Sequence, residues 1–141
     1  MRTITASLRR SGPLFAAAAL WLLAVALLHG PAAAQDLTTK TKSFTGVKAN
    51  TGFATLEKKG ATTTLTWSDD FTIPDSPAPH WQVIDTKGNV FLLQRLKIKE
   101  DRLNRTITLP AYVRDVATVR IWCAWAEVVL GEASLDKPVK L

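Results

Sequence analysis

Residues 119–131 read VRIWCAWAEVVLG and form the most apolar stretch after the N-terminal leader. β-Branched and aromatic residues dominate this stretch, which predicts a β-strand. Side chains alternate between the two faces of a strand. One face would then carry the odd-numbered residues Val119, Ile121, Cys123 and Trp125. Because Arg120 lies on the other face, we expect the odd-numbered set to face the core, and we expect Gly131 to end the strand.

Short strand patterns separated by turn signals fill the rest of the chain after residue 43. They cover residues 53–57, 62–67, 81–85, 90–94 and 106–109. A loop with three prolines, residues 68–80, divides them. No stretch sustains a helical period over three turns. This pattern predicts an all-β fold, a single small antiparallel β-sandwich or partly closed barrel of about 7–9 short strands.

The first 34 residues have the features of a cleaved, helical secretory signal peptide. Three arginines precede the apolar segment Leu14–Leu28, and Ala32-Ala33-Ala34 gives small residues before a cut. The apolar segment is shorter than the roughly 20 residues that a membrane span needs. We therefore predict a signal peptide over 1–34, a flexible tail over 35–42 and one β domain over 43–141, with no membrane span after cleavage. The protein is expected in the periplasm or secreted.

The net charge of the exported part is mild. Three of the 18 basic residues lie in the leader and none of the 12 acids do, which leaves +3 for residues 35–141. Neither this charge nor the export route favours nucleic acid as a partner. A redox partner protein or a component of the cell envelope is the expected partner, and the oligomeric state is left open.

Cys123 is the only cysteine, so it cannot form a disulfide within the chain. A thiolate is the reactive form of cysteine, which makes Cys123 the redox candidate. The alternative is an inert packing group, because free cysteine is among the most buried residue types. Ile121 and Trp125 on the same face predict apolar surroundings, which would raise the thiol pKa.

Few side chains in this sequence could bind a cofactor. His80 is the only histidine outside the leader, so one chain cannot supply the two histidines of a blue-copper site or the three of a catalytic zinc site. A haem or metal held by Cys123 and His80 stays open, and Trp125 could stack on a planar cofactor. The alternative role for His80 is to order the proline-rich loop. No catalytic constellation is visible, so we do not expect an enzyme.

A basic stripe on one predicted strand offers a different function. Arg95, Lys97 and Lys99 alternate with apolar residues and should point outward together. Such a stripe is usually a solvated or protected edge, but it could dock an anionic envelope surface.

The closing part of the chain resembles the DM-thirteen domain family, a proposed electron-transfer domain often found with DOMON domains. The resemblance rests on Ile121-Trp122-Cys123 with Val119, Val128-Val129, Gly131, Ala133 and Leu135. Pro77 with His80, the segment Thr106–Pro110, and Phe44, Gly46 and Gly52 are compatible with earlier parts of the family pattern. The resemblance implies a small extracytoplasmic β domain whose cysteine, here Cys123, acts in redox chemistry as a bare thiol or by holding a prosthetic group.

Two main functional hypotheses follow from the sequence. The first is a redox or electron-transfer module centred on Cys123. The second is a non-catalytic binding or envelope-interaction module in which Cys123 is structural and the basic stripe carries the contact. An enzyme of another kind is a third hypothesis, with no residues to support it.

Overall fold

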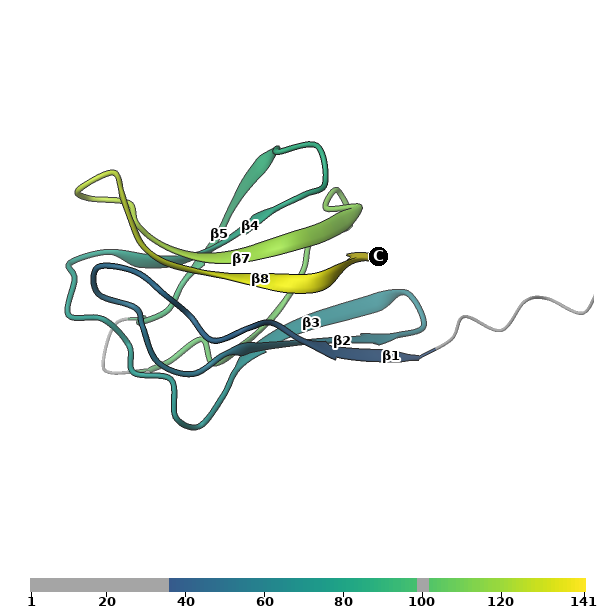
Figure 1. The fold of residues 1–141 in the computed structure, drawn as a ribbon, viewed down its shortest axis with the longest axis horizontal. Coiled ribbons are helices and arrows are strands. Elements are labelled where there is room, and N and C mark those ends of the chain that lie inside the picture. The colour runs from purple at the N-terminus through teal and green to yellow at the C-terminus, as the bar shows by residue number, and fades with distance from the viewer. Residues whose placement is uncertain (1–35, 99–101) are drawn as a thin grey trace, which may run out of the picture. The chain divides into compact units, whose positions relative to one another are not determined.

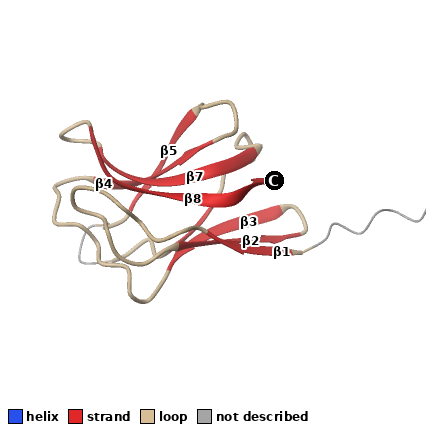
Figure 2. Ribbon diagram, in the orientation of Figure 1, coloured by secondary structure: helices blue, strands red, loops and turns tan. Residues whose placement is uncertain are grey.

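Eight strands make up the part of the chain that the computed structural model describes, residues 36–98 and 102–141. No helix occurs within these residues, which confirms the predicted all-β class (Figure 2). The predicted signal peptide, residues 1–34, lies outside them. The strands are β1 (Leu37–Lys40), β2 (Ala54–Lys59), β3 (Thr62–Trp67), β4 (Pro79–Ile84), β5 (Val90–Arg95), β6 (Thr106–Thr108), β7 (Asp115–Cys123) and β8 (Val128–Lys140).

The strands form two antiparallel sheets of four that face each other (Figure 1). The first sheet has the order β1-β2-β3-β6 and the second the order β5-β4-β7-β8. Both contribute to one apolar core. Trp67 of the first sheet stacks on Trp81 of the second, with ring centroids 5.4 Å apart. Such an aromatic pair adds about 0.5–1.5 kcal/mol beyond the burial of its area.

Alternation along the strands places the core as the sequence predicts. In β3, Thr63, Leu65 and Trp67 are buried while the threonines between them are more exposed. In β7, Val119, Ile121 and Cys123 are buried. The expected core face of the Cys123 strand is therefore confirmed for these three residues.

The prediction of a flexible tail over residues 35–42 is wrong for β1. Leu37–Lys40 pairs along its whole length with β2, with Thr39 opposite Leu56. The β-branched threonines that made this segment look polar also suit an edge strand. Their β propensity, not their polarity, therefore decides the structure of this segment.

The chain after β1 leaves the first sheet and lies along the free edge of β8. We call residues 41–49 the edge segment. The backbones of Thr45 and Glu132 exchange two hydrogen bonds of 2.9 Å, and the N–H groups of Lys48 and Ala49 both donate to the Leu130 carbonyl. The edge segment thus covers backbone groups that would otherwise be open to another chain.

The predicted strand over residues 119–131 is two strands joined by a turn. β7 ends at Cys123, residues 124–127 turn, and β8 begins at Val128, opposite Cys123. Glu127 adopts φ +52°, which is uncommon for a residue other than glycine. Gly131 lies inside β8 and does not end a strand.

Candidate functional site

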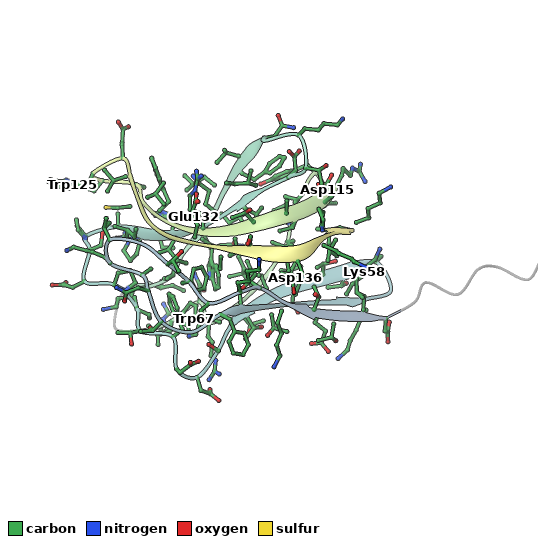
Figure 3. The ribbon with its side chains drawn as sticks, viewed as in Figure 1. Lys58, Trp67, Asp115, Trp125, Glu132 and Asp136 are labelled. Carbon is green, nitrogen blue, oxygen red and sulfur yellow. The ribbon has the colours of Figure 1, made fainter. Side chains whose placement is uncertain are left out.

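Cys123 lies at the end of β7, in the middle of the second sheet. Its register partners are Pro79 in β4 and Val128 in β8. The residue is 1% exposed and faces the core. Cys123 is the last residue of β7, and the 124–127 turn follows it directly. Cys123 therefore lies on an inner strand of the sheet but at the end of that strand. Figure 3 shows Trp125 at the tip of this turn.

The sulfur of Cys123 accepts a hydrogen bond from the backbone of the turn that follows β7. The pKa of the thiol is lowered, and the largest cause is a hydrogen bond with the Ser76 side chain. Burial acts in the opposite direction, while the backbone N–H groups of Ala126, Trp125 and Ala78 lower the pKa further. The Ala126 nitrogen lies 3.4 Å from Sγ. These donors stabilise a thiolate, because they compensate its charge as it loses water.

The expectation of a raised thiol pKa is therefore wrong. That expectation requires Trp125 to continue the strand and to pack beside Cys123. Instead the Trp125 side chain is 76% exposed, and only its backbone N–H acts on the sulfur. Because of the turn, the Trp125 side chain does not pack beside Cys123, and backbone N–H groups of the turn act on the sulfur instead.

Ser76 is the residue of this site that the sequence reading missed. It belongs to the proline-rich loop before β4 and meets Cys123 because Pro79 pairs with Cys123. The Ala124 N–H donates to the Ala78 carbonyl at 2.9 Å, which ties the turn to the same loop. No local motif marks this contact, since it depends on the pairing of β4 with β7.

His80 lies on the opposite face of the second sheet from Cys123. It pairs with Trp122, the neighbour of Cys123, and side chains of adjacent residues in a strand point to opposite faces. Its Nδ1 lies 2.8 Å from the Ala78 carbonyl oxygen, a contact that suits a role in ordering the proline-rich loop. The structure thus does not bring Cys123 and His80 together on one face. Within residues 36–98 and 102–141, no group of three or more His, Cys, Asp or Glu side chains could hold a metal ion.

Part of the predicted basic stripe lines an open pocket beside this site. Arg95, Lys97 and Ile98 form it with Ser76, Pro77 and Pro79, and its volume is about 510 Å³. The Arg95 guanidinium donates to the Pro77 carbonyl at 2.7 Å, which fixes it over the loop. Lys99 lies outside the described residues. Ser76 is shared by this pocket and by the Cys123 site.

A polar row crosses the outer face of the second sheet. Arg120 in β7 forms an ion pair with Glu132 in β8 and donates to the Gln82 side chain in β4 at 3.1 Å. The sequence predicts Arg120 on this outer face, whereas its partners depend on the pairing of β7 with β4 and β8. Because the three side chains satisfy one another, this row stabilises strand pairing.

Comparison with known proteins gives no match. The chain matches no protein-family model, and no curated protein or solved structure is significantly similar to it. The resemblance to the DM-thirteen family therefore stays a prediction. Among the described residues, no helix is both long enough and apolar enough to span a membrane.

Proposed function

We propose that this protein is an extracytoplasmic redox module that uses Cys123 as a bare thiol. The observation that carries the proposal is the hydrogen bond from the Ala126 N–H, whose nitrogen lies 3.4 Å from Sγ. It is supported by the lowered pKa of the thiol, of which the Ser76 side chain is the largest cause. A packing cysteine in an apolar core would have a raised pKa, whereas this one is lowered. The signal-like leader supports export, and the closing motif's resemblance to the DM-thirteen family supports a redox role for this cysteine.

The chemistry that this site supports is thiol–disulfide exchange. The Cys123 thiolate attacks one sulfur of a partner protein's disulfide, and a bond forms between the two sulfurs. The old disulfide bond breaks, and its second sulfur leaves as a thiolate with the electron pair. The sulfur of Cys123 is oxidised and the leaving sulfur is reduced. The lowered pKa of Cys123 increases the fraction of thiolate, which is the attacking form.

Because Cys123 is 1% exposed, a partner's disulfide reaches the sulfur only if its surroundings open, and we place that opening at the 124–127 turn. Three features make this turn the point of entry: it supplies two of the N–H donors, it contains Glu127 at positive φ, and it exposes Trp125 at its tip. A partner that contacts Trp125 would engage the segment that covers Cys123. Exposed tryptophan is a common anchor in protein interfaces.

The test is the pH dependence of Cys123 alkylation by iodoacetamide, followed by intact-protein mass. The folded protein should alkylate with a midpoint below that of the same protein in urea, because folding lowers the pKa of the thiol. Ser76→Ala removes the largest stabilising contact and should raise the midpoint. Folded wild-type protein treated with a small disulfide should gain one attached thiol.

Two controls make the result specific. Ser43→Ala removes a serine hydroxyl on a different segment and should leave the midpoint unchanged, while Cys123→Ala should not react. If folded protein reacts only as fast as it unfolds, Cys123 is a packing residue and the redox proposal is wrong. An equal midpoint for wild type and Ser76→Ala would also contradict it.

A second candidate function is the non-catalytic binding module. The observation that favours it is the basic pocket beside Ser76, where Arg95 and Lys97 contribute two cationic side chains to one concave surface. An anionic envelope component is the partner that such a surface would attract. In this case Cys123 is structural.

A further inference from the structure

The outer face of the second sheet carries two adjacent rows of side chains that cross its strands. The register places four residues of the first row opposite one another on β5, β4, β7 and β8, namely Arg95, His80, Trp122 and Val129. The polar row around Arg120 lies beside it, two residues along β7 from Trp122. Because Ile121 and Cys123 on either side of Trp122 are buried, both rows face away from the core.

Trp122 is a half-buried aromatic ring on this outer face, whereas Trp67 and Trp81 belong to the core. Polar side chains flank it, with His80 opposite on β4 and Arg120 two residues before it on β7. A sugar ring has apolar C–H groups that pack on an aromatic ring and hydroxyls that bond to polar neighbours. The surroundings of Trp122 therefore suit a saccharide.

A pocket lies at each end of these rows. The basic pocket at the β5 end contains Arg95 of the first row. A pocket of about 260 Å³ at the β8 end lies against the edge segment, and hydroxyl and charged groups line it, namely Lys42, Ser43, Thr45, Thr118, Glu132 and Ser134. Glu132 also belongs to the polar row. Since neighbouring strands lie about 4.8 Å apart, the first row is about 14 Å long, which fits an extended ligand better than a compact one.

The uncompensated charge of this outer face is positive. Glu132 forms an ion pair with Arg120, and the Lys42 ammonium lies 3.6 Å from a carboxylate oxygen of Asp136. No carboxylate of residues 36–98 and 102–141 forms an ion pair with Arg95 or Lys97. A ligand that carries carboxylates complements these two cations.

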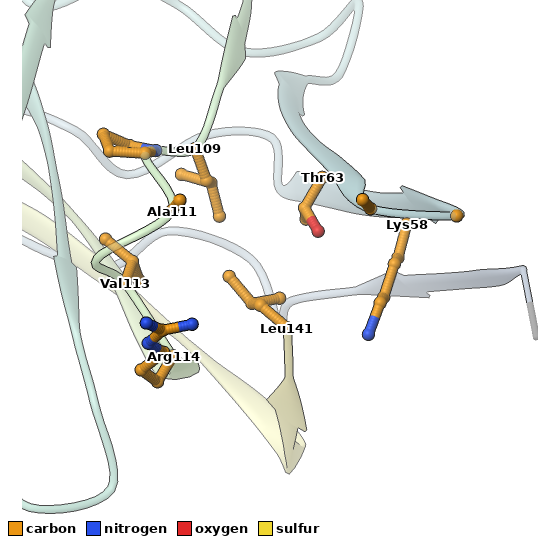
Figure 4. Close-up of a pocket in the computed structure, with 10 residues that line it drawn as sticks. Lys58, Thr63, Leu109, Ala111, Val113, Arg114 and Leu141 are labelled. Carbon is orange, nitrogen blue, oxygen red and sulfur yellow. The ribbon is translucent and has the colours of Figure 1, made fainter. Parts of the chain in front are cut away.

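The pocket between the β2–β3 hairpin and the β6–β7 connection also contains two cations, Lys58 and Arg114. There the Leu141 side chain lies between them (Figure 4). These two charges therefore do not share one open surface, unlike Arg95 and Lys97 in the basic pocket.

We propose that the outer face of the second sheet binds an extended acidic polysaccharide. One sugar ring stacks on Trp122, and carboxylates of the chain lie against Arg95 and Lys97. Hydroxyls of the chain bond to the polar row and to the pocket beside the edge segment. This inference rests on the second candidate function, the binding module, and is independent of the chemistry of Cys123.

The test is an NMR titration of the full protein with tetragalacturonate, with cellotetraose as the neutral probe of equal length. Tetragalacturonate should shift the Trp122 indole N–H and the Gln82 side-chain amide to saturation. Cellotetraose should bind at least about tenfold more weakly, because it lacks the hydrogen bonds to charged groups. Trp122→Ala should weaken tetragalacturonate binding about tenfold by removing the stacked ring. Arg95→Gln with Lys97→Gln should remove the preference for the acidic tetramer.

Trp125→Ala is the matched control for the ring, since Figure 3 shows Trp125 at the tip of its turn, away from Glu132. It should leave the tetragalacturonate affinity unchanged. Arg95 and Lys97 are exposed, so their double variant is expected to fold and keeps the test decisive if Trp122→Ala does not.

Three results would overturn the proposal. Cellotetraose could bind as tightly as tetragalacturonate, or Trp125→Ala could weaken binding as much as Trp122→Ala. Phosphatidylglycerol vesicles could bind the protein while tetragalacturonate does not, which would assign the two cations to lipid and leave the second candidate function intact. If neither the tetramer nor the vesicles bind, the second candidate function is wrong as well.

Discussion

Gly131→Ala should destabilise the domain strongly, because the edge segment lies directly against β8 at this residue. A Cβ at Gly131 would lie 2.1 Å from the Ala49 carbonyl oxygen and 2.8 Å from the Ala49 Cβ. Gly46 approaches from the same side, and a Cβ there would lie 2.4 Å from the Gly131 Cα. Two backbones are therefore in contact here, and neither has a flexible side chain that could move aside.

The expected loss in the free energy of unfolding can be worked out from the contacts that the new Cβ at Gly131 would displace. Overpacking of this kind raises the energy of the folded state by about 1–3 kcal/mol. If the edge segment retreats, the hydrogen bonds from Lys48 and Ala49 to the Leu130 carbonyl, at 3.0 and 2.9 Å, are weakened, at about 0.5–1.5 kcal/mol each. The lower chain entropy of alanine in the unfolded state offsets about 0.4–1 kcal/mol. We expect a net loss of about 2–4 kcal/mol, a large part of the roughly 5–15 kcal/mol that stabilises a typical domain.

The assay is urea unfolding followed by tryptophan fluorescence, because Trp67 and Trp81 stack in the core. Gly60→Ala is the matched control. Nothing lies within 4 Å of a Cβ at Gly60, so only its positive φ of +57° disfavours alanine, at about 1–2 kcal/mol. If Gly131→Ala lowers the free energy of unfolding no more than Gly60→Ala does, the close contact between the edge segment and β8 is not as described.

Two further predictions concern the Cys123 site and the basic pocket beside it. The folded-state pKa of Cys123 is below its unfolded value, so the thiolate stabilises the fold above the unfolded pKa, and this contribution is lost as pH falls through the folded pKa. The free energy of unfolding of wild type relative to Cys123→Ala, from urea titrations, should therefore rise from neutral to alkaline pH; a flat difference would contradict the lowered pKa. For the binding-module alternative, Arg95→Glu with Lys97→Glu should abolish co-sedimentation with anionic vesicles, while Cys123→Ala leaves it intact. Unchanged sedimentation of the double variant would eliminate that alternative.

The sequence predicts the all-β class and the inward face of the main strands because alternation is a local property. Val119, Ile121 and Cys123 alternate with Arg120 and Trp122 whatever the rest of the chain does. The turn at residues 124–127 cannot be predicted from the sequence, and the reason is physical. It has no Gly, Pro, Asn or Asp, and Glu127 adopts the positive φ that such residues usually supply.

The candidate site is less predictable than the fold, because its chemistry depends on contacts between distant segments. Cys123 is visible as the only cysteine, but its pKa depends on Ser76 and Ala78, which β4 brings beside β7. His80 and Cys123 look like one ligand set in the sequence. The pairing of His80 with Trp122 separates them, since it places them on opposite faces of the same sheet.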